Sequence, residues 1–405
     1  MRICLINNLY SPYVLGGTEV YLDALIKYLS MEHQICLITT IPFRGLGSLT
    51  PKFEESGNVR IFRFYPLNVY HLYDRSRSVI PKAIWYLSDI YNIHTCRTVR
   101  QVLREEKPSL VHTHNLRGLS MAVWDAVKTE GLPLVHTLHD YHLISRNSML
   151  LHGKNAQLCD GNDLECKIYR SLMRRLVDNK PDFVISPSRF VLDKHLEAGF
   201  FVSSRKAVLP LWGDPPISEY LSTSEEGCHL RALYIGTISR HKGVRYLVLA
   251  FRRLIDKEAS LEIIGSGDQE LDECRRLAAN DSRIHFRGFM SGKEKEAVLN
   301  WANVIVLPSV WYDNAPLVIL ESFARGKPVI ASRIGGIPEL VEHEKNGLLF
   351  EPRNINELVV CLEKLGRDHN LLEKLSKNAI KTALRLSAEA HVISLLKIYQ
   401  SVCKS

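Results

Sequence analysis

Short apolar runs rich in β-branched residues alternate along the chain with longer segments whose apolar positions recur every three or four residues. The short runs have the length and composition of buried strands, and the longer segments have the periodicity of amphipathic helices. Residues 19–30 and 85–106 are two such predicted helices. In the first half of the chain, we predict strands at RICLINN, QICLITT, NVRIFRF, SLVHTHN, PLVHTLHD and DFVISPS.

The same alternation restarts after the polar stretch LSTSEEGCH at residues 221–229. Strands that alternate with helices form parallel sheets covered by helices on both faces, and a chain of 405 residues favours two domains over one. We therefore predict the α/β class, with two doubly wound, Rossmann-like domains facing across a cleft. The second set of predicted strands is RALYIGTI, SLEIIGSG, RIHFRGF, ANVIVLPS, KPVIAS and NGLLFE.

The domain boundary is predicted near residues 210–228. The first domain then spans residues 1–210 and the second spans residues 229–385. A last helical segment, residues 386–405, follows the final predicted strand. We expect this segment to return to the first domain.

Positive charge is concentrated in the first half of the chain. Residues 1–206 hold 26 Lys and Arg against 19 Asp and Glu, whereas the whole chain holds 52 against 44. A basic half beside a neutral one indicates an anionic partner, such as a phospholipid surface or a phosphorylated substrate. No recognition motif for nucleic acid accompanies the charge, so nucleic acid is not expected as a partner.

No apolar run approaches the roughly 18 residues of a membrane-spanning helix, and the first residues read as a strand, not as a signal peptide. We therefore expect a cytoplasmic protein. The nine cysteines are scattered, which is typical of reduced thiols. Cys159 and Cys166 share a polar loop without two further ligands nearby, so a plain loop is favoured over a metal site or a disulfide, and no metal is predicted.

Ligands of open α/β sheets bind beyond the carboxyl ends of the strands, and each candidate motif follows a predicted strand. Gly16 and Gly17 open a helix, where flexible backbone and free N–H groups suit a phosphate, although a tight turn explains them equally well. The segment is not G-x-G-x-x-G, and no acid follows at the spacing of a ribose ligand. A dinucleotide cofactor is therefore disfavoured.

Histidines follow or occupy two strands of the first domain. His139 can donate a hydrogen bond to a substrate hydroxyl or phosphate, and the adjacent Asp140 would favour its charged form. A structural role is the alternative for His139. His112 and His114 alternate along a strand, and we expect them to pack in the core.

In the second domain, Gly236 begins the turn between the first strand and its helix, and Arg240 and Lys242 follow it. Cations at this turn can neutralise a diphosphate leaving group without a metal, whereas solvated charges are the alternative. Gly265 and Gly267 end the next strand, where missing side chains let a nucleobase approach the backbone, unless they form a simple turn. Arg287, after the following strand, would close the same pocket.

The segment WYDNAPLVILE places Asp313 in a loop and Glu321 on the helix that follows. Proline suits the first turn of a helix because its missing N–H is not needed there. The unit offers one carboxylate to sugar hydroxyls, helix N–H groups to a phosphate, and a second carboxylate to ribose hydroxyls. The residues at the predicted helix start are Asn314, Ala315, Pro316 and Leu317.

These motifs together resemble the family 4 retaining glycosyltransferases, the group 1 glycosyl transferases of GT-B fold. Residues 308–350 carry the most specific part of the resemblance, and GGTE, LHD, YIGTISRHKG, IIGSG and FRGF follow in the order of the family. The resemblance implies transfer of a sugar from a UDP- or GDP-sugar with retention at the anomeric carbon, and with no cofactor or metal. It also implies that the second domain binds the donor and the first binds the acceptor.

The resemblance implies a role for each matching residue. Glu321 would hold the donor ribose, Lys242 the diphosphate, and Asp313 the transferred sugar, although the family typically has Glu at that position. Thr237 stands where the family usually has a second basic residue, and we expect Arg240 to supply the missing charge. Further matches are Gly17 near the diphosphate, His139 near the reacting centre, and Gly336 and Glu339 as supports of the donor pocket.

The implied chemistry is a same-face displacement in which the departing phosphate helps to take the proton of the acceptor. The acceptor is expected to be a glycan or a lipid-linked saccharide. Residues 167–180 form a predicted basic helix with Arg174 and Arg175, and residues 80–93 form an aromatic one. Such helices can lie on an anionic membrane, which predicts peripheral association, although ordinary core helices explain the pattern as well.

Two other interpretations stay open. One is a different enzyme on the same fold, a phosphorylase or a nucleotide-sugar epimerase; no motif identifies the pyridoxal-binding lysine of a phosphorylase. The other is a partner subunit that binds the donor but is inactive, which Thr237 and Asp313 motivate.

Overall fold

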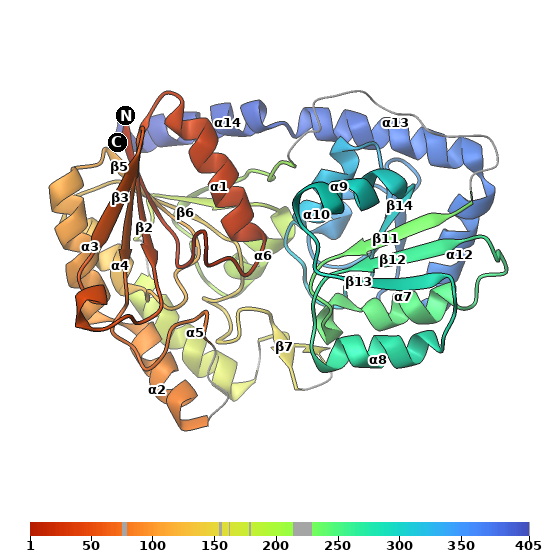
Figure 1. Cartoon of the computed structure of the whole chain (residues 1–405). Helices are drawn as coiled ribbons and strands as arrows, with labels where there is room; N and C mark the ends of the chain where they lie inside the picture. The colour runs from red at the N-terminus through yellow and green to blue at the C-terminus, as the bar shows by residue number, and fades with distance from the viewer. Residues whose placement is uncertain (75–78, 154–155, 162, 178–179, 214–228, 405) are drawn as a thin grey trace. The chain divides into compact units, whose positions relative to one another are not determined.

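The contacts between residues divide the chain into two compact units (Figure 1). The first unit comprises Met1–Leu150, Asp160–Pro210 and His391–Ser405, and the second comprises Leu151–Cys159 and Leu211–Ala390. Most of the predicted linker lies outside the described residues. The computed structural model describes residues 1–74, 79–153, 156–161, 163–177, 180–213 and 229–404.

The first unit is built on an eight-stranded sheet with the strand order β10-β9-β6-β5-β1-β2-β4-β3. Neighbouring strands pair in parallel except at the edge, where β3 pairs antiparallel with β4. The sequence KFEES of β3 is exposed along its whole length, so it lacks the apolar alternation that predicts a strand. The strands are β1 (Arg2–Ile6), β2 (Gln34–Thr40), β3 (Lys52–Ser56), β4 (Val59–Phe64), β5 (Leu110–Thr113), β6 (Leu134–Thr137), β9 (Phe183–Ser186) and β10 (Arg205–Val208).

The prediction of one helix over residues 85–106 is wrong, because two helices meet there. The side chain of Asn92 accepts a hydrogen bond from Thr95 N at 3.0 Å and so caps the second helix. Asn92 also donates to the carbonyl of Leu67 at 3.0 Å, which fixes the break in place. The helices of this unit are α1 (Gly17–Ser30), α2 (Val79–Ile90), α3 (Ile93–Glu106), α4 (Ala122–Thr129), α5 (Leu164–Val177), α6 (Arg189–Glu197) and α14 (Ala388–Cys403).

The last helix, α14, packs on the first unit through buried polar side chains. The hydroxyl of Tyr399 lies 2.6 Å from His112 Nδ1. His391 Nδ1 donates to the carbonyl of Pro210 at 2.8 Å, and its Nε2 lies 3.0 Å from the hydroxyl of Tyr21. These bonds tie the end of the chain to β5, α1 and the segment after β10.

The second unit contains a six-stranded parallel sheet with the order β13-β12-β11-β14-β15-β16. The order reverses at β11, whose neighbours are β12 and β14, so the topological switch point lies between β11 and β14. The two-unit α/β class with doubly wound parallel sheets is thus confirmed. The strands are β11 (Arg231–Ile235), β12 (Ser260–Ile264), β13 (Ile284–Gly288), β14 (Val304–Leu307), β15 (Val329–Ser332) and β16 (Gly347–Phe350), and a separate pair is β7 (Leu151–His152) with β8 (Gln157–Leu158).

Helices cover this sheet and complete its core. Tyr234, Phe251, Leu261 and Phe350 are among the fully buried side chains of that core. No helix of the described part of the chain is long and apolar enough to span a bilayer. The helices of the second unit are α7 (Val244–Phe251), α8 (Gln269–Ala278), α9 (Gly292–Trp301), α10 (Leu317–Ala324), α11 (Ile337–Leu340), α12 (Ile355–Arg367) and α13 (His369–Arg385).

Candidate active site

The two loops at the switch point of the second unit carry most of the predicted site residues. One loop follows β11 and contains a short 3₁₀ turn, Arg240–Lys242, and the other follows β14 and leads into α10. Val310 N donates to the carbonyl of His241 at 2.9 Å and joins the two loops. Ligands of doubly wound sheets bind at this place, because the loops on either side of the switch point diverge there.

Lys242 and Asp313 meet across the two loops. Lys242 Nζ donates to Asp313 Oδ2 at 2.7 Å, and the two side chains are 21% and 9% exposed. The ring of Trp311 lies 5.0 Å from the Lys242 ammonium. Among the described residues, Lys242 Nζ makes no other hydrogen bond, so two of the three N–H groups of the ammonium can donate to a ligand.

Three donors hold a single oxygen of the Asp313 carboxylate. Besides Lys242, Ser309 Oγ donates to Asp313 Oδ2 at 3.1 Å and Trp311 Nε1 donates to it at 3.2 Å. Oδ1 accepts no hydrogen bond from the part of the chain that the structure describes, so it can accept one from a ligand hydroxyl. The sequence analysis did not assign a role to Ser309 or Trp311. Their position close to an acid just after a strand could have identified them.

Glycines also fix the backbone of Asp313. Gly336 N donates to the carbonyl of Asp313 at 2.7 Å. Gly335 has φ +62°, and a Cβ there would lie 2.3 Å from the same carbonyl oxygen. Any side chain at Gly335 would therefore displace the loop that carries the carboxylate. Gly336 thus contacts the predicted site directly, whereas Glu339, at the end of the same turn, is exposed.

Arg240 pairs with an acid of α8 in this structure, and its role as a second charge beside Lys242 stays a prediction. Arg240 Nε lies 3.5 Å from Glu270 Oε2, and Arg245 binds both oxygens of the same carboxylate at 2.7 Å. The buried carboxylate of Glu270 thus attracts Arg240 as well as Arg245. Thr237 is exposed, and its carbonyl accepts from Tyr234.

The two glycines after β12 pack against the backbone of the loop after β11. A Cβ at Gly265, where φ is +150°, would lie 1.8 Å from the carbonyl oxygen of Gly236. A Cβ at Gly267 would lie 2.2 Å from the carbonyl oxygen of Ile238. The missing side chains therefore allow the two loops to approach each other, which the sequence pattern did not distinguish from space left for a nucleobase.

Arg287 lies at the end of β13 and binds a buried acid of the neighbouring strand. Its Nε and Nη2 donate to the two oxygens of Glu262 at 2.6 and 2.8 Å. The Arg287 side chain is 49% exposed, so the pairing leaves part of it open to solvent. Closure of the pocket by Arg287 stays a prediction.

The predicted helix start after Asp313 is confirmed. Pro316 is the N-cap residue of α10, no side chain caps the helix, and Leu317 is its first residue. The first N–H groups of α10 are thus available to an anion. Glu321 lies one turn further, and its Oε2 accepts from Lys295 Nζ of α9 at 2.7 Å. Asn314 and Ala315 connect Asp313 to this helix, and Ala315 is buried.

In the first unit, the N–H of Gly16 is not free as expected. Gly16 N and Leu15 N donate to Glu19 Oε2 at 2.8 and 3.1 Å. Glu19 is 5% exposed, and burial raises the pKa of its carboxyl above the ordinary value. An acid of the first helical turn therefore occupies the N–H groups that a phosphate would need, while Gly17 begins α1.

His139 is half-buried beside buried histidines, and its pKa is shifted away from the charged form that the sequence suggested. His139 Nε2 lies 3.0 Å from His114 Nδ1. Burial, together with repulsion from His391, lowers the pKa of His139 to about 3, so the ring is neutral at pH 7 and can donate only one hydrogen bond. His112 and His114 are 0% and 1% exposed, as predicted for packing residues.

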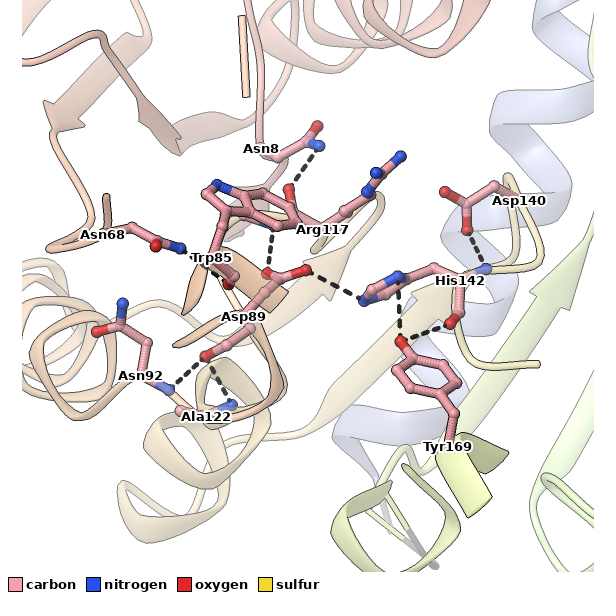
Figure 2. Close-up of polar contacts among 12 residues, drawn as sticks. Asn8, Asn68, Trp85, Asp89, Asn92, Arg117, Ala122, Asp140, His142 and Tyr169 are labelled. Carbon is pink, nitrogen blue, oxygen red and sulfur yellow. Dashed lines mark hydrogen bonds and ion pairs between the residues drawn. The ribbon is translucent and has the colours of Figure 1, made fainter. Parts of the chain in front are cut away.

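Asp140 bonds to the backbone of His142 and not to the adjacent His139. Its Oδ1 accepts from His142 N at 2.9 Å, and burial raises the pKa of its carboxyl to about 6 (Figure 2). Figure 2 shows His142 between Asp140 and Asp89, whose Oδ2 lies 3.8 Å from His142 Nε2. Tyr169 of α5 donates to the carbonyl of His142 at 2.9 Å. The loop after β6 is thus tied to α2 and α5.

The two loop cysteines belong to different units. Cys159 lies in the second unit, whereas Cys166 lies on α5 in the first. The thiol of Cys166 lies 3.9 Å from Ser145 Oγ. Cys166 thus packs on its own unit.

Comparison with known families agrees with this geometry. Residues 229–368 match the family described as glycosyl transferases group 1, and residues 16–212 match the family described as glycosyl transferase 4-like domain. The chain is a group 1 glycosyltransferase of the family 4 type. The first match includes all strands of the six-stranded sheet, and the second includes all strands of the eight-stranded sheet except β1.

Relatives of this glycosyltransferase extend over most of its length. A Klebsiella pneumoniae protein described as an uncharacterised protein in a cps region is 29% identical, covering 84% of this chain and 87% of that protein. Sucrose-phosphate synthase from Thermosynechococcus elongatus has a TM-score of 0.74 at 21% identity, covering 99% and 98% of the two chains. Anabaena HepE in complex with UDP-glucose has a TM-score of 0.67 at 17% identity, covering 99% and 100%. These structures show that the fold is GT-B.

Proposed function

We propose that this glycosyltransferase moves a hexose from a UDP- or GDP-sugar to a glycan or lipid-linked saccharide, with retention at the anomeric carbon and without a metal or other cofactor. The observation that carries the proposal is the Lys242–Asp313 pair at the switch point, which offers a cation and an unused carboxylate oxygen at one place. The HepE structure, which contains UDP-glucose, supports a nucleotide-sugar donor. The cps-region relative supports a role in polysaccharide biosynthesis.

Each group of the site has a task in this reaction. The two unused N–H groups of Lys242 and the first N–H groups of α10 stabilise the charge that develops on the departing diphosphate. Asp313 Oδ1 accepts a hydrogen bond from a hydroxyl of the transferred sugar, and Glu321 accepts from the ribose.

The displacement occurs on one face of the sugar. The bond between the anomeric carbon and the diphosphate oxygen breaks, and the acceptor oxygen bonds to the same face of that carbon. The acceptor hydroxyl gives its proton to the departing phosphate oxygen, so no enzymic base is consumed. A cation and helix N–H groups thereby replace the metal that would otherwise neutralise the diphosphate.

Release of free nucleotide from a panel of UDP- and GDP-sugars tests the proposal. We expect one donor to be consumed, with stimulation by a membrane lipid extract from the source cells and no loss of rate in EDTA. Glu321→Ala is expected to lower the affinity for the nucleotide sugar by roughly 10-fold or more, because it removes the carboxylate that accepts hydrogen bonds from the ribose. Full turnover by Glu321→Ala would contradict the ribose assignment.

A second candidate function is a donor-binding subunit without catalytic activity. It is favoured by Thr237, which leaves one diphosphate cation missing, and by Arg240, which pairs with Glu270. Saturable donor binding with no nucleotide release under any condition would support this candidate. Release of an altered free sugar without an acceptor would instead indicate an epimerase.

We further propose that an anionic membrane surface binds the first unit through α2 and α5. Leu164, Ile168 and Leu172 recur every four residues along α5 and are 73%, 61% and 39% exposed. Ile84 and Leu87 of α2 are 48% and 69% exposed. Such rows of exposed apolar side chains are favourable only where a partner or a lipid surface covers them.

Basic side chains accompany these apolar rows. Lys167 and Arg175 of α5 are exposed beside the apolar row. Arg146 connects the two helices, because its guanidinium lies 4.6 Å from the ring centre of Tyr86 on α2 and it pairs with Glu165 on α5. Cations beside an exposed apolar stripe favour anionic headgroups, each contributing about 1 kcal/mol near the surface.

We expect the protein to sediment with vesicles that contain anionic lipid at low salt and to be released as the ionic strength rises. Ile168→Glu is expected to weaken this binding about tenfold or more, because it removes apolar burial worth roughly 1.5 to 3 kcal/mol and adds a negative charge. Val360→Glu is the matched control, since Val360 is 63% exposed in the second unit. Absence of binding to anionic vesicles at low salt would contradict the proposal.

A further inference from the structure

Two ion pairs of different kinds connect α9 and α10. Arg325 binds both carboxylate oxygens of Glu296, with Nε–Oε2 and Nη2–Oε1 distances of 3.1 and 2.8 Å. Lys295 makes a single bond to Glu321, of 2.7 Å from Nζ to Oε2. The first pair is bidentate and uses both oxygens, whereas the second uses one oxygen and one N–H group.

The second pair therefore has unused donors and acceptors. Among the residues that the structure describes, Lys295 Nζ donates no other hydrogen bond, and Glu321 Oε1 accepts none. The two side chains are 28% and 19% exposed, so a ligand can reach them. A hydroxyl both donates and accepts, so two neighbouring hydroxyls fit a carboxylate and an ammonium that lie side by side.

We propose that Lys295 is a second ribose-binding residue, whose ammonium donates to a ribose hydroxyl of the nucleotide while Glu321 accepts from the same diol. This inference rests on the proposed function, which places the ribose at Glu321. Helix α9 follows β13 and α10 follows β14, and these strands lie on opposite sides of the switch point. Lys295 would thereby make the site discriminate against deoxynucleotides.

A purely structural role for Lys295 is the alternative explanation. Partly exposed ion pairs contribute little to stability, and the Glu296–Arg325 pair already connects the same two helices. If Lys295 only connects the two helices, its substitution should affect ribonucleotide and deoxynucleotide binding equally, as substitution of Glu296 should. A ribose-binding role would make only Lys295 sensitive to the hydroxyls of the nucleotide.

Calorimetric titration with UDP, GDP and their 2′-deoxy and 3′-deoxy forms separates the two roles without any need for turnover. We expect Lys295→Met to lower the affinity for the preferred ribonucleotide by about 10-fold, because a charge-assisted hydrogen bond is lost. The same variant should lower the affinity for at least one deoxynucleotide by less than about twofold, because that ligand lacks the hydroxyl to which Lys295 would donate. Lys295→Arg should retain part of the preference for the ribonucleotide.

Two variants serve as controls. Lys293→Met removes an exposed lysine from the same helix and should change neither affinity. Glu296→Gln weakens the other ion pair and should leave the ratio of ribonucleotide to deoxynucleotide affinity unchanged. Equal weakening of ribonucleotide and deoxynucleotides by Lys295→Met would overturn the inference. Absence of nucleotide binding to the unaltered protein would overturn the proposed function and this inference with it.

Discussion

Replacing Lys242 by methionine is expected to lower kcat by roughly 10²- to 10³-fold, since a lost stabiliser of transition-state charge typically costs about 3 to 4 kcal/mol. The methionine keeps the aliphatic chain beside Trp311 but loses the N–H groups that we propose bind the diphosphate. The loss should appear in kcat and in kcat/KM together, because the interaction strengthens as charge develops on the leaving group. Initial rates of nucleotide release with the accepted donor measure this effect.

The variant Arg240→Met is the matched control for this prediction. Arg240 lies 3.5 Å from Glu270 and is 47% exposed, so its removal should change the rate much less than that of Lys242. A thermal unfolding curve of each variant separates a loss of chemistry from a loss of folding. Full turnover by both variants would show that the leaving-group assignment is wrong, and a larger effect of Arg240→Met would show that Arg240 turns toward the donor during the reaction.

Acidification is expected to unfold the first unit between about pH 6 and pH 4.5, because many histidines are held neutral there. Burial lowers the pKa of His136, His139 and His142 to about 3 each, and that of His195 and His391 to about 4. Their contribution is fully present above the ordinary pKa of about 6.5 and is lost as the pH falls, since only the unfolded chain binds the protons.

These five histidines all change the stability in the same direction, and they outnumber the two buried acids that act in the opposite direction. A fully shifted histidine costs up to about 1.4 kcal/mol of unfolding free energy per pH unit below pH 6.5. Circular dichroism and thermal melts between pH 8 and pH 4.5 measure the loss.

Two acids oppose this trend and provide its control. Burial raises the pKa of Asp89 to about 7 and that of Asp140 to about 6, so the folded protein binds protons there that the unfolded chain releases. Their contribution to stability therefore rises as the pH falls toward 4.

The variant Asp89→Asn tests this contribution, because it keeps an oxygen for the N–H of Gly118 but removes the charge. We expect this variant to be more stable than the unaltered protein at pH 8 and to lose that advantage at pH 5. Constant stability from pH 8 to pH 4.5 would contradict the assignment of neutral buried histidines.

Several features of the site could be predicted from local sequence. The strand ANVIVLPS, the loop acid and the proline that begins a helix all act within a few residues of one another, so the pattern alone indicated that Asp313 precedes α10. The sequence also indicated that the glycines in the loops after β11 and β12 allow a close approach, because a missing side chain permits this whatever group approaches. The sequence could not show that the approaching partner is the carbonyl of Gly236, since that contact joins two separate loops.

Charge partners were the features that sequence did not predict. Arg240 looks available in the sequence, and only the fold brings the buried Glu270 of α8 beside it. The same holds for Lys295, whose helix GKEKEAVLNW has no pattern that distinguishes one lysine from another. His139 looks charged beside Asp140, but its pKa depends on burial and on His391 of α14.

The sequence by itself determined the α/β class, the two sheets, the family and the order of the site motifs, because strand and helix periodicity and the chemistry of short loops are local properties. The tertiary structure decided which charges are satisfied, which histidines are neutral and which glycines touch backbone. These depend on distances between segments far apart in the chain and on the removal of water around them, and neither is a property of a single stretch of sequence.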